Sequence, residues 1–499
     1  MGMYAKLNWN YLEKYFLEFS GRYDGSSRFA PDNRWGFFPS FSAGYNIANE
    51  DYFKSWNLPI SQLKVRVSYG RLGNQNGAGL YDYLGYMDLV ASPADAWLLP
   101  GVSVTPAKGI IAGTPKMTSP YITWEKSENA NLGIDLSMLD DRLNVTADIY
   151  QRTTKDMIGP AETIPAIGGI NKDKSAKINN ATLRNRGWEL TVNWQDEFKC
   201  GLSYGIGFNI SNYKAVVTKY NNPEGIITNN HTGLPQNRGF YEGMDLGEIW
   251  GYQADDLFMS NREVDEYLKT VDLSYFKPDN AWQRGDVKFI DSNGDGKVDP
   301  GSGTLADHGD LKKIGNVAPK YSFGINLSVG YKGFGVSALF QGVGKRDFAV
   351  AGSQYLFSDN CYFKEHLDHF SPDHPSGYLP RLTSNKVDNQ VNSGYNTTRY
   401  LLNAAYMRHK NLTVSYDFKP QVVKFIGLSG LRVYFTCDNL FTITKLPNQF
   451  DPETINQVNW IVGGSSDAAP VLTSPLTANG NGRVYPMNRN FVFGIDVTF

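Results

Sequence analysis

Apolar and polar residues alternate along much of this chain. In residues 143–149, LNVTADI, every second side chain is apolar. A period of two is that of a β-strand, whose successive side chains point to opposite faces. The same pattern predicts strands at residues 3–11, 15–23, 35–48, 63–69, 132–136, 143–149, 188–194, 202–210, 321–329 and 334–340, a pair on either side of 419–430, and a last strand over 489–499.

The connections between these strands are alternately short and long. A few residues join the two members of each pair, whereas long irregular segments such as 73–126 and 212–319 separate the pairs. Outer-membrane barrels have this rhythm, with short periplasmic turns and long extracellular loops. The pattern therefore predicts an all-β fold, a transmembrane antiparallel β-barrel with about thirteen spanning strands in this chain.

The last strand, RNFVFGIDVTF, has the clearest division into two faces. Its apolar residues share one face, and small or polar residues dominate the other. A closed barrel in lipid suits such a strand because it leaves no backbone edge unpaired. The apolar positions are Phe491, Phe493, Ile495, Val497 and Phe499.

Composition supports a membrane span made of strands. Aromatic residues make up 14% of the 499 residues, and 50 residues are glycine, yet the mean hydropathy is -0.39. This combination is expected when half of each strand faces a wet lumen. No run approaches the roughly 18 apolar residues of a transmembrane helix.

Charge and cysteine content exclude other classes. A net charge of -2 and a pI near 6.3 give no basic surface for phosphates, so no nucleic-acid partner is expected. The three cysteines, Cys200, Cys361 and Cys437, have no zinc-site spacing. The first residues form a predicted strand rather than a signal peptide.

Several blocks resemble one known family. KYFLEFSGRYDGSSRFAPDNRWGFFPSFSAGYNIANE from Lys14, WEKSENANLGIDLSMLDDRLNVTADIYQRTTKDM from Trp124, GDVKFIDSNGDGKVD from Gly285 and LRVYFTCDNLFTITKLPNQFDPE from Leu431 are similar, in this order, to the barrel of SusC/RagA-like TonB-dependent outer-membrane transporters. The resemblance covers essentially the whole chain.

The resemblance implies a 22-stranded barrel filled by an N-terminal plug. An odd strand count, no signal peptide and a start within a strand lead us to expect that residues 1–499 are the C-terminal part of such a barrel, without signal peptide, periplasmic domain or plug. The family would import oligosaccharides or peptides delivered by a SusD-like surface lipoprotein. It would draw energy from the TonB complex, acting through the missing N-terminal part, in the outer membrane of a Gram-negative bacterium.

We do not expect this polypeptide alone to be transport-competent. The family likeness also makes the strand Phe491–Phe499 a candidate signal for the barrel-insertion machinery. Two alternatives to the importer remain at this point: a passive outer-membrane pore, and a soluble lectin-like β-sandwich.

Residues 291–299, DSNGDGKVD, have the pattern of a calcium loop. Oxygens of Asp291, Asn293, Asp295 and Asp299, with the carbonyl of Lys297, would surround a hard cation. The glycine at the sixth position of the loop would allow the sharp turn. Position 12 is Ser302 rather than a bidentate glutamate, unless Asp307 or Asp310 reaches in. The alternative is a polar turn without metal, and no cofactor is required otherwise.

Aromatic residues in the long segments are candidates for stacking on sugar rings. Each could equally pack the loops against one another. The candidates are Trp97, Trp250, Tyr252, Trp282 and Tyr355.

Two further motifs favour no enzyme. Residues 201–205 match the G-x-S-x-G nucleophile motif, but Ser203 begins an alternating strand instead of a strand-to-helix turn. His366, His369 and His374 have no helical zinc-site spacing.

Overall fold

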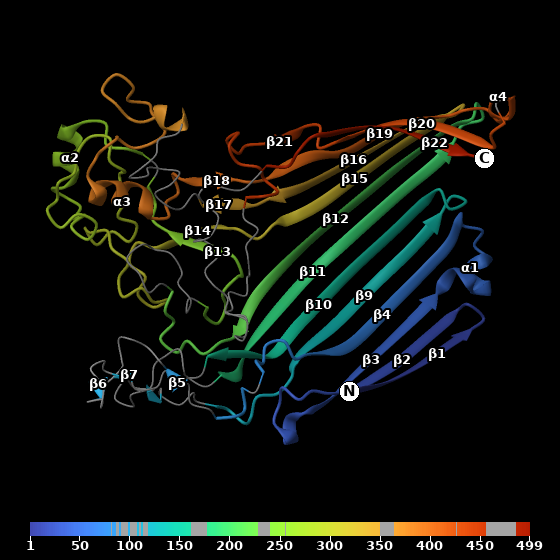
Figure 1. Cartoon of the computed structure of the whole chain (residues 1–499), viewed down its shortest axis with the longest axis horizontal. Helices are drawn as coiled ribbons and strands as arrows, with labels where there is room; N and C mark the ends of the chain where they lie inside the picture. The colour runs from blue at the N-terminus through green and yellow to red at the C-terminus, as the bar shows by residue number, and fades with distance from the viewer. Residues whose placement is uncertain are drawn as a thin grey trace.

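The computed structural model describes residues 1–80, 82–85, 89–90, 98–99, 107–108, 111–112, 118–160, 177–227, 240–254, 256–349, 364–425, 427–455 and 486–499. A strongly tilted, curved sheet fills one half of the molecule, and long loops gather at the other end (Figure 1).

The sheet is one antiparallel ladder in chain order. Among the described residues it has 14 strands, of which β21 (Thr442–Thr444) lies off the main path and pairs with β19. The main path runs through β1 (Gly2–Tyr11), β2 (Tyr15–Gly25), β3 (Trp35–Asn46), β4 (Ile60–Asn74), β9 (Glu125–Met138), β10 (Leu143–Pro160), β11 (Lys177–Glu197), β12 (Leu202–Lys219), β15 (Lys320–Tyr331), β16 (Phe334–Lys345), β19 (Tyr406–Asp417), β20 (Gly430–Asp438) and β22 (Asn490–Thr498).

Each predicted strand has its counterpart on this path, so the predicted all-β fold with antiparallel barrel strands is confirmed. The soluble β-sandwich is wrong, because one continuous curved sheet carries the strands and its apolar side chains remain exposed. Leu7, Phe19 and Phe493 are 67%, 48% and 81% exposed.

The register places apolar and polar residues on opposite faces of the sheet. Val145 pairs with Leu136 on one side and Val192 on the other. One position along, Asn144 pairs with Ser137 and Asn193. Because side chains opposite each other across a ladder share a face, the alternation of each strand becomes an apolar surface and a polar surface of the whole sheet.

Short turns close one end of the sheet. Lys332 and Gly333, with φ of 46° and 89°, join β15 to β16 in the left-handed conformation that a tight hairpin requires. The turn segments with α1 (Asp51–Lys54) and α4 (Pro420–Phe425) lie at this same end. None of the described helices is long and apolar enough to cross a membrane.

Several strands are longer than the alternation predicts. The predicted strands 143–149, 188–194 and 202–210 extend to Pro160, back to Lys177 and on to Lys219, respectively. Their added residues are largely polar and continue the ladder toward the loops, where the alternation of apolar residues ends.

The long loops fold into a body of their own, which we call the loop lobe: the described residues of 217–319, 346–405 and 445–455. Its elements are short: β13 (Glu248–Gly251), β14 (Lys312–Asn316), β17 (Asp347–Ala349), β18 (Leu401–Asn403), α2 (Asn261–Tyr267), α3 (Lys386–Gly394) and the 3₁₀ turn Lys364–Leu367. They surround the largest buried hydrophobic cluster given by the described residues.

The remaining short elements of the described residues are not part of the large sheet. They are the 3₁₀ turns Pro31–Asn33 and Ile47–Asn49, and two small ladders, β5 (Leu89–Val90) with β8 (Ile111–Ala112) and β6 (Leu98–Leu99) with β7 (Ala107–Lys108).

Candidate functional site

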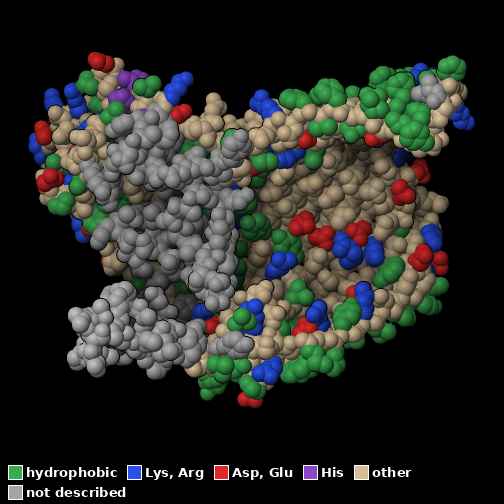
Figure 2. Space-filling view, in the orientation of Figure 1, with side chains coloured by type: hydrophobic (Ala, Val, Ile, Leu, Met, Phe, Trp, Pro, Cys, Tyr) green, Lys and Arg blue, Asp and Glu red, His purple; other side chains and the backbone are tan. Residues whose placement is uncertain are grey.

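The concave face of the sheet is polar. One hollow on it is lined by residues of β11, β12, β15, β16 and β19, and about half of these are Asn, Ser, Thr or Gly. Acidic and basic side chains stand next to each other in the hollow of the sheet, while hydrophobic side chains gather along its margins (Figure 2). A wall of this kind can lie against a hydrated solute or a polar protein domain.

Neighbouring strands are tied across this face by an ionic network. The Arg66 guanidinium on β4 lies 2.6 Å from Asp135 on β9 and 3.2 Å from Asp148 on β10. Asn131 donates a hydrogen bond of 3.0 Å to the Asp148 carboxylate. These groups lie on the polar face with Asn144 and Thr146, so they fix charge on the lumenal wall.

A second ionic cluster joins the large sheet, which we call the wall, to the loop lobe. Arg408 on β19 is 4% exposed and lies 2.8 Å from Asp451 and 3.1 Å from Glu453. Asp451 also accepts a hydrogen bond from the Met487 N–H, and Lys410 lies 3.0 Å from Glu453. Burial opposes ionisation of Asp451, but Arg408 and backbone N–H groups hold the pKa of its carboxyl below its ordinary value.

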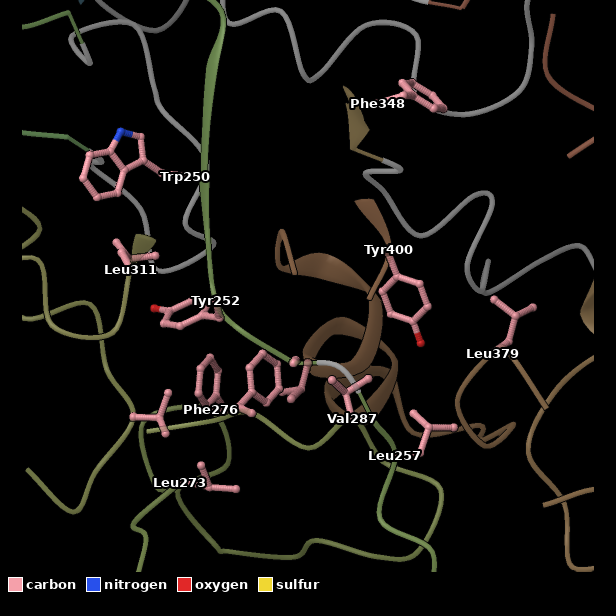
Figure 3. Close-up of a cluster of buried hydrophobic side chains, with 14 of the residues drawn as sticks. Trp250, Tyr252, Leu257, Leu273, Phe276, Val287, Leu311, Phe348, Leu379 and Tyr400 are labelled. Carbon is pink, nitrogen blue, oxygen red and sulfur yellow. The ribbon is translucent and has the colours of Figure 1, made fainter. Parts of the chain in front are cut away.

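Three of the five predicted substrate-binding aromatics lie inside the loop lobe. Trp250, Tyr252 and Trp282 are 5%, 0% and 6% exposed. The Tyr252 ring meets Phe276 edge-on at 5.1 Å, and Figure 3 shows the two rings side by side in the buried core. Their placement is that of the packing alternative, and contact with a substrate stays a prediction. Trp97 and Tyr355 lie outside the described residues.

Buried charges hold the same lobe together. Lys277 is 1% exposed and lies 2.8 Å from Asp286 and 2.7 Å from Asp388, which stands on α3. Arg381 lies 2.6 Å from each of these carboxylates. Burial opposes ionisation of Asp388, but the Lys277 and Arg381 cations hold the pKa of its carboxyl below its ordinary value. The cluster thereby joins two loop segments about a hundred residues apart in sequence.

The calcium-like loop is closed by its own hydrogen bonds. Asp291 accepts from the N–H groups of Gly294 and Gly296, at 2.6 and 2.8 Å. Asn293 and Asp295 each accept from the N–H two residues on. Asp310 accepts from the N–H groups of Ser292 and Asp299, so it ties the two ends of the loop.

The charges of this loop are also engaged within it. Lys297 lies 2.8 Å from the Asp299 carboxylate. Burial opposes ionisation of Asp291, yet the N–H groups around it lower the pKa of its carboxyl, whereas burial raises that of Asp310. In the part of the chain that the structure describes, no three acidic, histidine or cysteine side chains are grouped so as to hold a metal ion. The geometry is that of successive Asx turns, and calcium binding stays a prediction.

The enzyme-like motifs are placed on ordinary structural elements. Ser203 is the second residue of β12, and its hydroxyl donates to the Gly330 carbonyl on the next strand. His374 lies 2.9 Å from Asp368, and His369 contacts the His366 carbonyl. The contacts given for Ser203 and for these histidines do not pair a nucleophile with a base.

The last strand presents its aromatic face outward. Phe491, Phe493, Ile495 and Val497 stand opposite Cys437, Phe435, Val433 and Leu431 of β20. Phe499 ends the chain just beyond β22 and is 91% exposed. The apolar row is therefore continuous with that of the neighbouring strand, while recognition by the insertion machinery stays a prediction.

Sequence reasoning missed the ionic clusters around Arg408 and Lys277. Arg408 and Asp451 come from segments read as a strand and a loop, and Lys277 and Asp388 from two separate loops. The only sequence signal was the pair of acidic residues in Asp451-Pro452-Glu453, which gives no partner. Such pairs become visible only when distant segments are brought together.

Comparison with known proteins places the chain among bacterial receptors. The profile of the family described as "TonB dependent receptor-like, beta-barrel" matches residues 1–440. TonB-dependent receptor P3 of Formosa agariphila is 26% identical over 458 residues, covering 91% of this chain and 42% of the relative. TonB-dependent receptor SusC of Bacteroides thetaiotaomicron is 26% identical over 508 residues, covering 99% of this chain and 43% of the relative.

A solved structure shows the same fold. The RagAB peptide importer in its 'open-open' state matches with a TM-score of 0.71 and 22% identity, over 100% of this chain and 46% of that one. This chain thus spans less than half the length of the relatives it matches. The matched family is one of outer-membrane receptors and transporters rather than enzymes. The chain belongs to the TonB-dependent receptor-like β-barrel family.

Proposed function

We propose that this chain is barrel wall and loop lobe of an outer-membrane importer for a hydrophilic nutrient. The observation that carries the proposal is the two-faced register of the sheet, with Val145 on an apolar surface and Asn144 on a polar one. A sheet of this kind suits a wall between lipid and a wet lumen. The end with short turns would face the periplasm, and the loop lobe would lie outside the cell.

Oligosaccharides are the substrate class we favour, with peptides as the alternative. Amide and hydroxyl side chains line part of the hollow on the concave wall, among them Asn193, Asn326, Ser328 and Thr413. Such groups both donate and accept hydrogen bonds, as a sugar requires. The likeness of the fold to the RagAB peptide importer supports peptides as the alternative.

The partners follow from the same proposal. A SusD-like surface lipoprotein would deliver the nutrient at the loop lobe. The TonB complex would act through the N-terminal part that the relatives have and that residues 1–499 do not span. Outer-membrane lipid would contact the apolar face, and the barrel-insertion machinery would read the last strand. We infer no nucleic-acid partner, and a calcium ion in the loop at Asp291 is an optional addition.

Uptake in the bacterium that carries the gene tests the proposal. Deleting the gene should abolish saturable uptake of one class of labelled oligosaccharide, and a protonophore should have the same effect in the parent strain. If labelled peptides are affected instead, the substrate class changes. Uptake that is linear in concentration and indifferent to the protonophore would identify a passive pore and contradict the importer.

A further inference from the structure

The outward apolar surface ends at a row of basic side chains on its loop-lobe side. On β11 the outward residues are Trp194, Val192, Leu190 and Trp188, and then Arg186 and Arg184. On β12 the outward series passes from Ile210 through Asn212 to Lys214. The change from apolar to basic occurs within two residue pairs on each strand.

The register brings these basic residues together. Arg186 stands opposite Lys214 of β12 and Gln151 of β10. Thr153 of β10 pairs with Arg184 of β11 on one side and with Glu128 of β9 on the other. Glu128 in turn pairs with Arg71 of β4. We call Arg71, Lys155, Arg184, Arg186 and Lys214 the basic belt.

The belt carries more positive charge than its neighbours neutralise. Arg71 and Lys155 share one carboxylate, Glu128, at 2.9 and 2.7 Å. Lys214 lies 4.0 Å from Asp245. Arg186 donates to the neutral amide of Gln151 at 2.6 Å, and Arg184 has no ion pair among those that the described residues form. The next outward pair, Lys126 with Asp156, is neutral as a whole.

The opposite end of the sheet is different. There Lys14 lies 3.0 Å from Glu50, and Arg142 lies near both Asp140 and Asp196. Lys14 and Arg142 are thus matched by carboxylates, whereas the belt at the loop-lobe end of the outward face keeps an excess of positive charge.

The position determines what could neutralise this excess. A solute in the lumen meets the other face of the sheet, so it cannot reach the belt. Long basic side chains beside an apolar surface lay their stems on it and place their charge at the level of lipid headgroups. The Lys155 and Lys214 side chains are 47% and 65% exposed, so they are accessible from outside the barrel. Arginine forks match phosphate oxygens with two parallel hydrogen bonds.

We propose that the basic belt binds the phosphate of an anionic lipid headgroup in the leaflet on the loop-lobe side of the membrane. Arg184 and Arg186 would hold the phosphate, and Lys214 and Lys155 would flank it. The acyl chains would lie along the apolar rows that begin at Trp188 and Ile210. This inference rests on the proposed placement of the wall in a membrane.

Lipid binding to the full chain in neutral detergent micelles tests it. The probe is a fluorescent bisphosphorylated lipid A, compared with the same lipid without its phosphates. The variant Arg184→Gln with Arg186→Gln should bind the phosphorylated lipid roughly 10- to 30-fold more weakly than the parent. The matched control, Lys64→Gln with Arg152→Gln, removes the same charge from the lumenal face and should bind as the parent does. Inorganic phosphate at millimolar concentration should not compete, because it lacks the chains.

The outcomes separate the lipid site from the membrane placement. Folding in micelles is followed independently by circular dichroism and by protection of the sheet from protease. A folded parent that binds both lipids equally, or a belt variant that binds as tightly as the parent, overturns the phosphate site alone. Competition by inorganic phosphate would show a simple anion site instead and also overturn the lipid assignment. A parent that stays outside the micelles contradicts the membrane placement and the lipid site together.

Discussion

The wall and the loop lobe place their apolar residues differently: the wall exposes them, and the lobe buries them. In the wall, Leu7, Phe19 and Phe493 are exposed and polar groups such as Asp148 line the concave side. In the lobe, Phe289 and Tyr252 are fully buried. The same chain therefore contains an apolar surface suited to contact with lipid and a buried apolar core of the kind that stabilises a domain in water.

The difference shows where stability comes from in each region. Backbone ladders join each strand of the wall to the next strand on the path, even where a long loop separates the two in sequence, as between β12 and β15. The lobe depends on aromatic packing and on ion pairs between segments far apart. Phe276 stacks on Phe289 at 4.2 Å, and Asp286 meets Arg381 at 2.6 Å. Damage to the core of one region should therefore leave the other region folded.

The largest expected effect is in the lobe core. Phe289→Ala should cost about 3–5 kcal/mol of local stability, because it removes a fully buried ring and leaves a cavity. Protease cleavage within 256–311 should become much faster, while the wall keeps its hydrogen-exchange protection. Met259→Ala, at a side chain that is 53% exposed, is the control and should change little. Simultaneous loss of protection in the wall would show that the two regions unfold as one.

In the wall, a charge on the apolar face should be next in cost. Val145→Arg should destabilise the sheet by about 2–4 kcal/mol in a bilayer. Asn144→Arg, one residue away on the polar face, should cost far less. The measurement is urea unfolding in lipid vesicles. Equal costs at the two positions would contradict the assignment of the faces.

Acid should loosen the lobe. Asp388→Asn removes charge-assisted hydrogen bonds from Lys277 and Arg381 and should cost about 1.5–3 kcal/mol at pH 7. The pKa of Asp388 is lowered below 3.8 in the folded protein, so its contribution is present above about pH 4 and is lost as pH falls through the folded pKa. The stability difference between parent and variant should therefore shrink below pH 3.8. A difference that stays constant down to the acid limit would show that the ion pairs are not its source.

The smallest expected effect concerns the loop at Asp291. If calcium replaces the N–H partners there, it should protect 256–311 from protease, and Asp291→Ala with Asp295→Ala should abolish that protection. Lys332→Ala, in a turn at the other end of the sheet, is the control. Equal cleavage of the parent with and without calcium would leave only the Asx turns.

The sequence predicted the wall far better than the lobe. Alternation in 143–149 depends on local order alone, so it marks the strand and its two faces without knowledge of any partner. The extension of β10 to Pro160 was missed because its outward residues there, Gln151 and Thr153, are polar in a strand that continues beyond the apolar rows.

The lobe could not be predicted in the same way. The Tyr252 N–H bonds to the Asn396 carbonyl, 144 residues away in sequence, and Lys277 finds Asp388 across a similar gap. Segments 212–319 and 364–405 have no period of their own, because their structure follows from contacts with each other. For this reason Trp250 and Trp282 were as plausible on a surface as in a core, and the buried lysine gave no signal at all.

Single-cysteine labelling at Val145 and Asn144 tests the central claim most directly. In a background where Cys200, Cys361 and Cys437 are replaced by serine, each position is changed to cysteine in the full chain and placed in lipid vesicles. The two-faced wall predicts that the cysteine at 145 reacts with a lipid-soluble maleimide and resists a water-soluble one, with the opposite result at 144. The reverse preference, or equal reaction of both positions with the water-soluble reagent, would contradict a wall between lipid and a wet lumen.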